Sequence, residues 1–317
     1  MKGPLPQLDR LVLTDGGLET DFIFNRGVDL PCFASIVLLG TDKGRAALEA
    51  YYRPYLELAR GLGTGFILES ATWRASPDWA APLGLRPAEL DGLNIAAIDL
   101  LHQLREEFAS STFEIVISGC VGPRGDGYDP GQFMDVTAAA GYHLHQARVL
   151  AAAGADMLSA LTMTNVNEAT GVVLAAQEVG LPVAVSFTLE TDGRLPTGDP
   201  LMNAVEAVDT ATGEYPAYYM INCAHPDHFA AVLEESAAWT QRIRGVRANA
   251  SRCSHRELDA MTTLDAGDPV ELGRLYRRLL ERQPQITVLG GCCGTDLRHV
   301  TAVAEACVNR PANPQAP

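Results

Sequence analysis

Short apolar runs alternate with amphipathic segments along the whole chain, and this alternation limits the fold more than any other feature. The segments between the runs carry apolar residues at i, i+3 and i+4, as in 44–62, 88–108, 137–154 and 269–283, which is typical of helices. Nearly continuous apolar strands separated by helices predict a parallel sheet covered by helices. The expected strands lie at 10–17, 65–72, 113–120, 156–162, 182–189, 217–223, 243–250 and 286–293.

Eight is the number of strands that closes a (β/α)8 barrel, and 317 residues suit such a barrel. We therefore expect one α/β domain, a TIM-type barrel over residues 1–310, followed by a disordered tail at 311–317. An open, doubly wound sheet is the alternative. The glycines of 61–66 do not favour a dinucleotide-binding loop, because they close a helix and precede a strand instead of following one.

The charge and the cysteine content narrow the class of protein. A formal net charge of −15 argues against a nucleic-acid partner, which requires a basic surface. No window approaches 18 uninterrupted apolar residues, and the first ten residues lack the apolar core of a signal peptide. Seven cysteines, an odd number in a long chain, do not indicate a disulfide framework. We expect a cytoplasmic protein with no membrane partner, and a homo-oligomer remains open.

Polar and sulfur-bearing residues gather where the expected strands end. In an α/β barrel the functional side chains project from the carboxyl ends of the strands. We therefore expect substrates to contact the polar and aromatic residues found there. These are Asp15, Gly16, Gly17, Glu69, Thr72, Trp73, Thr162 and Asn222.

Three thiols are expected at one rim, at the ends of the sixth and eighth expected strands, which have one strand between them. They belong to Cys223, Cys292 and Cys293. Thiolates favour Zn²⁺ over Mg²⁺ or Ca²⁺, and three protein ligands leave a fourth position for a substrate. Glycines on both sides of the adjacent pair would let both side chains turn toward one ion. The sequence thus predicts a zinc site at the carboxyl-terminal rim, and the alternative is three buried, unreactive thiols.

With these motifs the chain resembles the homocysteine S-methyltransferase family, zinc-dependent thiol methyltransferases built on a (β/α)8 barrel. "GGCCGT" (290–295) and "INCAHP" (221–226) carry the resemblance, which extends over about residues 8–308. "DGGLET" (15–20), "ESATW" (69–73) and "GCVGPRG" (119–125) are similar to further family motifs. The resemblance implies that the three cysteines named above are the zinc ligands and the catalytic groups, and that Asp15 and its glycines contact homocysteine.

The resemblance also implies the reaction. A methyl group would move from a small sulfonium donor, S-methylmethionine or S-adenosylmethionine, to the thiolate of homocysteine, giving methionine, or to a related thiol or selenol. A zinc-bound thiol loses its proton, while three anionic ligands keep its sulfur nucleophilic. Two other functions stay open: a zinc hydrolase or lyase with Asp15 or Glu69 as general base, and a zinc- or thiol-binding barrel without catalysis.

Leu161 departs from the family pattern. The fourth strand of the family usually ends in Glu-Thr, and that Glu binds the ammonium group of the substrate, whereas this chain has Leu161-Thr162. Burying an ammonium group without a counter-charge is costly. Either Asp15 and Glu69 supply the charge, or the acceptor lacks that amino group.

Three expectations concern single aromatic and ionisable residues. Trp73 either faces a sulfonium through its ring or packs at the barrel top. His143 and His145 point to different faces of a helix, so they cannot share a metal ion. Cys253 and His255 are expected in a surface loop.

Overall fold

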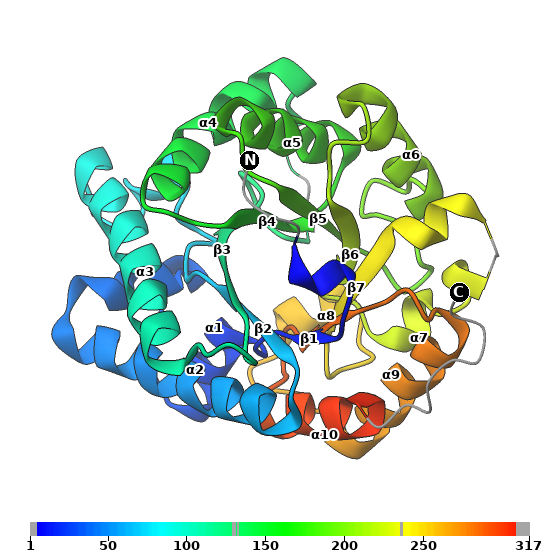
Figure 1. Ribbon diagram of the computed structural model, residues 1–317. Coiled ribbons are helices and arrows are strands. Elements are labelled where there is room, and N and C mark those ends of the chain that lie inside the picture. The colour runs from blue at the N-terminus through cyan, green and yellow to red at the C-terminus, as the bar shows by residue number, and fades with distance from the viewer. Residues whose placement is uncertain (1–4, 129–130, 132, 235–236, 309–317) are drawn as a thin grey trace.

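Eight parallel strands pair in sequence order and the last pairs with the first, so that the sheet closes into a barrel (Figure 1). The computed structural model describes residues 5–128, 131, 133–234 and 237–308. Each expected apolar run overlaps one strand, and two strands end one residue later than expected, which confirms the (β/α)8 prediction and excludes the open sheet. The strands are β1 (Val12–Leu13), β2 (Gly65–Glu69), β3 (Ile115–Val121), β4 (Met157–Met163), β5 (Val183–Thr188), β6 (Tyr218–Asn222), β7 (Ile243–Ala248) and β8 (Val288–Gly291).

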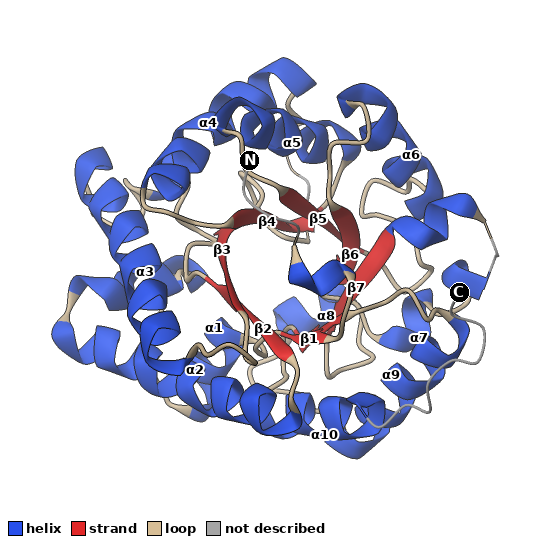
Figure 2. Ribbon diagram, viewed as in Figure 1, coloured by secondary structure: helices blue, strands red, loops and turns tan. Residues whose placement is uncertain are grey.

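Helices form the outer ring around the strands (Figure 2). In the described part of the chain, seven long helices lie between or after the strands: α2 (Asp42–Leu62), α3 (Pro87–Phe108), α4 (Val136–Ala152), α5 (Val166–Val179), α6 (Leu201–Thr212), α9 (Pro269–Arg282) and α10 (Leu297–Val308). Three short ones lie in the connections: α1 (Leu18–Thr20), α7 (Pro226–Phe229) and α8 (His255–Ala260). Among the described residues, no helix is long and apolar enough to cross a membrane. The expected tail, 311–317, lies outside the described residues.

Local signals explain where the helices begin and end. At the start of α2 the hydroxyl of Thr41 accepts a hydrogen bond from the Gly44 amide at 3.0 Å, as an N-cap residue does. At its end Gly63 has φ 69°, and its N–H reaches the last carbonyls of the helix. Strand β2 begins two residues later, so the glycines of 61–66 close a helix, as the sequence predicts.

The apolar residues form two layers because side chains alternate along each strand. One layer, with Leu13, Phe66 and Ile117, packs against the helices, and the other fills the barrel interior. A 3₁₀ helix, Pro6–Leu8, lies across the amino-terminal end of the barrel and faces the viewer in Figure 1. Its buried Gln7 donates to the Tyr218 hydroxyl at 3.4 Å, and its Gln7 carbonyl accepts from Thr287. The interior is therefore filled at this end.

Candidate metal centre and substrate cavity

A cavity of about 460 Å³ opens among the carboxyl ends of the strands. Most of the expected substrate contacts line it, and Thr72 is not among the described lining residues. The Thr72 hydroxyl instead donates to the Cys120 carbonyl at 2.6 Å, in the wall between β2 and β3. The expected contacts that do line the cavity are Asp15, Gly16, Gly17, Glu69, Trp73, Thr162 and Asn222.

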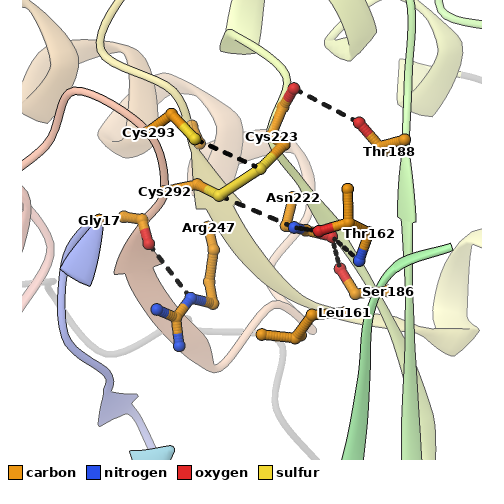
Figure 3. Close-up of a disulfide and its surroundings, with 12 residues drawn as sticks. Gly17, Leu161, Thr162, Ser186, Thr188, Asn222, Cys223, Arg247, Cys292 and Cys293 are labelled. Atoms are coloured by element: carbon orange, nitrogen blue, oxygen red, sulfur yellow. Dashed lines mark hydrogen bonds between the residues drawn. A yellow bond between two sulfur atoms is a disulfide. The ribbon is translucent and has the colours of Figure 1, made fainter. Parts of the chain in front are cut away.

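Cys223, Cys292 and Cys293 bring their sulfur atoms together at the rim of this cavity (Figure 3). The three Sγ atoms lie within 4.8 Å of one another, and those of Cys223 and Cys293 are 3.9 Å apart. Two thiolates on one tetrahedral zinc, each about 2.3 Å from the ion, lie about 3.8 Å apart. In the described part of the chain no other group of three or more His, Cys, Asp or Glu residues could hold a metal ion. The donor type and the spacing of Cys223 and Cys293 thus fit zinc.

The backbone around the sulfurs adopts conformations that few sequences allow. Cys223 and Thr162 have φ values of 52° and 62°, in the left-handed region that residues other than glycine rarely occupy. Gly294, directly after the adjacent cysteines, has φ 79°. At Gly17 a Cβ atom would lie 2.4 Å from the Cys292 carbonyl oxygen, so the close approach of these segments requires glycine. Such strain at a strand end is typical of functional sites.

A disulfide joins Cys223 and Cys292 in this structure (Figure 3). Two of the three expected zinc ligands are therefore paired in this structure, whereas the neighbours Cys292 and Cys293 are not bonded to each other. Sulfurs in a disulfide are not thiolates, so zinc binding by all three cysteines requires prior reduction. Cys293 remains a thiol, and burial raises its pKa to about 11.

Asn222 ties the sulfurs to the neighbouring strands. Its Oδ1 accepts from the Thr162 amide at 2.9 Å and from the Ser186 hydroxyl at 2.6 Å. Its Nδ2 donates to Thr162 Oγ1 at 2.8 Å and to Cys292 Sγ at 3.8 Å. These four contacts use the capacity of the side-chain amide, so Asn222 holds the strained Thr162 and orients Cys292.

Tyr128 and His255 cover the sulfurs, and the sequence did not reveal this contact. The Tyr128 hydroxyl donates to Cys293 Sγ at 3.5 Å, and its ring stacks on His255 with centroids 3.9 Å apart. His255 is 4% exposed, with Nε2 2.7 Å from the Cys223 carbonyl oxygen and Nδ1 3.1 Å from Glu190. The surface-loop expectation is therefore wrong for His255, because α8 folds over the barrel, while Cys253 is half-buried.

A second group of charges lies in the cavity wall around Arg247 of β7. Its Nη2 donates to Asp15 Oδ1 at 2.7 Å and to the Gly16 carbonyl at 3.2 Å, and its Nε donates to Gly291 at 3.1 Å. The Tyr51 hydroxyl donates to the other Asp15 oxygen at 3.0 Å. Burial lowers the pKa of Arg247, but Asp15 and then Glu69 raise it, and the net shift is upward. Asp15 is thus already paired with a permanent cation.

Glu69 lies beside the Arg247–Asp15 pair, and only one of its carboxylate oxygens accepts a hydrogen bond from a described residue. Its Oε1 accepts from the Ser159 hydroxyl at 2.9 Å and lies 4.0 Å from Arg247 Nη1. Burial raises the pKa of Glu69, against the opposing effect of Arg247. Leu161 also lines the cavity and contributes no charge.

Trp73 is packed on several sides. Its Nε1 donates to the Leu161 carbonyl at 3.3 Å, and Phe33 meets its ring edge-on with centroids 6.4 Å apart. The guanidinium carbon of Arg74 lies 5.1 Å from the ring centroid. The ring thus combines packing at the barrel top with a place in the cavity wall, and its contact with a sulfonium stays a prediction.

His143 and His145 point to different faces of α4, as expected. His143 pairs with Glu168 at 2.9 Å, and His145 pairs with Asp91 at 2.8 Å. Neither belongs to the sulfur cluster.

Comparison with known proteins places these features in context. A family model described as homocysteine S-methyltransferase matches residues 12–307. The homocysteine S-methyltransferase of Escherichia coli (strain K12) is 26% identical over 311 residues, 92% of this chain and 94% of that protein. Homocysteine S-methyltransferase 1 of Zea mays is 23% identical over 310 residues and 92% of each chain.

Solved structures share the fold. The oxidized form of the Escherichia coli homocysteine methyltransferase MmuM superposes with a TM-score of 0.75 at 22% identity, over 94% of this chain and 96% of that one. The metallated form of the same protein gives a TM-score of 0.71 at 23% identity, with the same coverage.

Proposed function

The chain belongs to the homocysteine S-methyltransferase family, and on that premise we propose that it is a zinc-dependent enzyme that methylates the thiolate of homocysteine to give methionine. The observation that carries the proposal is the cluster of three cysteine sulfurs at the rim of the cavity. The ligands would be Cys223, Cys292 and Cys293 as thiolates. Because thiolates persist in a reducing compartment, we place the active protein in the cytoplasm.

Zinc bound by three thiolates lowers the pKa of an acceptor thiol and leaves its sulfur nucleophilic. The chain itself positions the reacting groups. Asn222 fixes the direction of Cys292 Sγ, and the stacked Tyr128 and His255 cover one side of the sulfur cluster. The acceptor sulfur attacks the methyl carbon of the donor. The new S–CH₃ bond forms as the old one breaks, and the electron pair leaves with the donor sulfur as a neutral thioether.

The charge of the cavity mouth supports a cationic donor. Asp259 and Asp265 line the cavity on the segment that follows β7. Burial, together with the charge of Asp126, raises the pKa of Asp259. A negative mouth attracts a sulfonium and not an anionic donor. We propose S-methylmethionine or S-adenosylmethionine as the donor, and small molecules as the only substrates.

A zinc hydrolase or lyase is less well supported by this geometry. Such an enzyme requires a carboxylate that is free to act as a general base. Both oxygens of Asp15 are bound, by Arg247 and by Tyr51. Glu69 already accepts from Ser159 and lies beside the guanidinium of Arg247, which favours a role in binding.

A labelled-methyl assay tests the proposal. Reduced, zinc-loaded protein is incubated with homocysteine and with each donor carrying a deuterated methyl group, and labelled methionine is measured by mass spectrometry. We expect labelled methionine from one of the donors with the wild type and with Cys307→Ser, since Cys307 lies in α10 outside the sulfur cluster. Cys223→Ser should abolish it. No labelled methionine from either donor would overturn the proposal.

A further inference from the structure

Among the described residues that line the cavity and are more than nine-tenths buried, two charged side-chain atoms lack a hydrogen-bond partner. They are Nη1 of Arg247 and Oε2 of Glu69, and both residues line the cavity. Arg247 is 6% exposed and Glu69 is 5% exposed. A buried donor or acceptor without a partner is costly, and such exceptions in a native protein require an explanation.

Arg247 and Glu69 do not form a hydrogen bond with each other. The closest approach is 4.0 Å, between Arg247 Nη1 and Glu69 Oε1, which is too long for a hydrogen bond. The rest of the guanidinium is fixed by Asp15, Gly16 and Gly291. Arg247 Nη1 and Glu69 Oε2 are therefore fixed in position, and no described residue forms a hydrogen bond with either atom.

Position and charge point to the kind of group that would bind there. Arg247 and Leu161 lie on the same side of the three sulfurs (Figure 3). A molecule whose sulfur lies at the cysteines can therefore extend its other end toward Arg247. A guanidinium edge suits a carboxylate, and a lone carboxylate oxygen suits an ammonium group.

We propose that Arg247 and Glu69 together bind the α-amino acid end of the acceptor, an inference that rests on the proposed function. Arg247 Nη1 donates to the carboxylate, and Glu69 Oε2 accepts from the ammonium group. The counter-charge that is missing at Leu161 on β4 is then supplied from β2. Asp15 is less suited to supply it, because Arg247 neutralises its charge and Tyr51 binds its other oxygen.

The charges of the cavity make this pair selective for a zwitterion. Arg247 is paired with Asp15 at 2.7 Å and more loosely with Glu69 at 4.0 Å, so one cation faces two carboxyl groups. An acceptor without the amino group would add a third carboxylate to this group and bring no cation of its own. An acceptor without the carboxylate would leave Arg247 Nη1 unpaired. Both are disfavoured because a buried charge or donor stays unpaired.

Binding of the reaction product tests this without metal, reductant or donor. Methionine has the same amino acid end as homocysteine, and its thioether needs no thiolate chemistry. Isothermal titration of the full chain would compare methionine with 4-(methylsulfanyl)butanoate, which lacks the amino group, and 3-(methylsulfanyl)propan-1-amine, which lacks the carboxylate. We expect each analogue to bind about 10- to 100-fold more weakly than methionine, the range for a hydrogen bond to a charged group.

Variants assign the two groups. Glu69→Gln should lower methionine affinity about tenfold or more and remove most of the discrimination against the des-amino analogue. Arg247→Lys keeps the positive charge beside Asp15 but removes the Nη1 group that is proposed to bind the carboxylate. The affinity difference between methionine and 3-(methylsulfanyl)propan-1-amine should therefore become smaller. Arg277→Gln, an exposed change on α9, should leave all three affinities unchanged.

The outcomes separate this inference from the proposed function. Equal binding of all three ligands by the wild type, or full discrimination retained in Glu69→Gln, would overturn the inference. Either result stands even if Arg247→Lys fails to fold. Zwitterion-selective binding of methionine together with no methyl transfer would overturn the proposed function and leave the inference in place.

Discussion

The sulfur atoms of Cys223 and Cys293 lie 3.9 Å apart, although 70 residues separate the two cysteines in the sequence. Strands β6 and β8 carry them to the same rim, with β7 between. Once reduced, two thiols at this distance beside a third could hold one metal ion.

Reduced protein should bind one zinc ion per chain. Cys223→Ser and Cys292→Ser should lose it, because two remaining thiolates do not complete a zinc site. Cys253→Ser and Cys307→Ser are the matched controls, and both should keep the metal, since neither residue belongs to the sulfur cluster. Elemental analysis after zinc loading and desalting measures the content. Full zinc content in the Cys223 variant would refute the ligand assignment.

The oxidised protein should not take up zinc until it is reduced. The disulfide between Cys223 and Cys292 removes two of the seven cysteines of the sequence from the reactive thiols. Thiol titration in denaturant should therefore give five free thiols for protein purified without reductant and seven after reduction, the number in the sequence. Zinc binding should appear only in the second sample. Seven reactive thiols in oxidised protein would contradict the pairing.

Removal of zinc should stop catalysis and leave the barrel folded. The core spans the interior of the barrel and the layer beneath the helices, so it does not depend on one ion. This differs from a zinc finger, which unfolds without metal. Far-ultraviolet circular dichroism before and after chelation measures the effect. Loss of most of the signal would show that the site is structural.

Glu168→Gln should lower the free energy of unfolding at neutral pH, and the stability of this variant should decrease less than that of the wild type as the pH falls. Burial raises the pKa of Glu168, but His143 and the Arg124 amide lower it, with a net shift below the ordinary value of 4.5. A carboxyl with a lowered pKa stabilises the fold above pH 4.5, and this contribution disappears as the pH falls through the folded pKa. We expect a loss of about 1–3 kcal/mol in the free energy of unfolding at pH 7.

Chemical denaturation between pH 3 and pH 7 measures this difference. The difference in the free energy of unfolding between wild type and Glu168→Gln should become smaller as the pH falls below 4.5. Glu178→Gln on the same helix is the control, because Glu178 is exposed and its pairing with Arg148 is a surface contact. A gap of constant size across this range would show that Glu168 does not titrate in the way that its contacts imply.

The sequence predicted the barrel and the sulfur cluster because both depend on local signals. Apolar runs mark the strands, and parallel strands necessarily bring their carboxyl ends to one rim. Arg247 was missed even though a charged residue in a buried strand is itself a signal. Its partner Asp15 is 232 residues away, and nothing local in the sequence says which carboxylate a buried arginine meets.

Other features depend on tertiary packing or on chemical state. Ser254 and Glu257 form a capping box, which marks the start of α8. A cap fixes where a helix begins but not which surface it covers, so the burial of His255 could not be read from the motif. The disulfide between Cys223 and Cys292 depends on redox conditions, which a sequence does not encode.

Within the part of the chain that the structure describes, the 3₁₀ helix at Pro6–Leu8 closes the amino-terminal end of the barrel, where Gln7 contacts Tyr218. We therefore expect acceptor, donor and both products to pass through the opposite mouth. We expect an acceptor bound at the buried Arg247 and Glu69 to enter before a donor bound near the exposed Asp259, and methionine to leave after the spent donor.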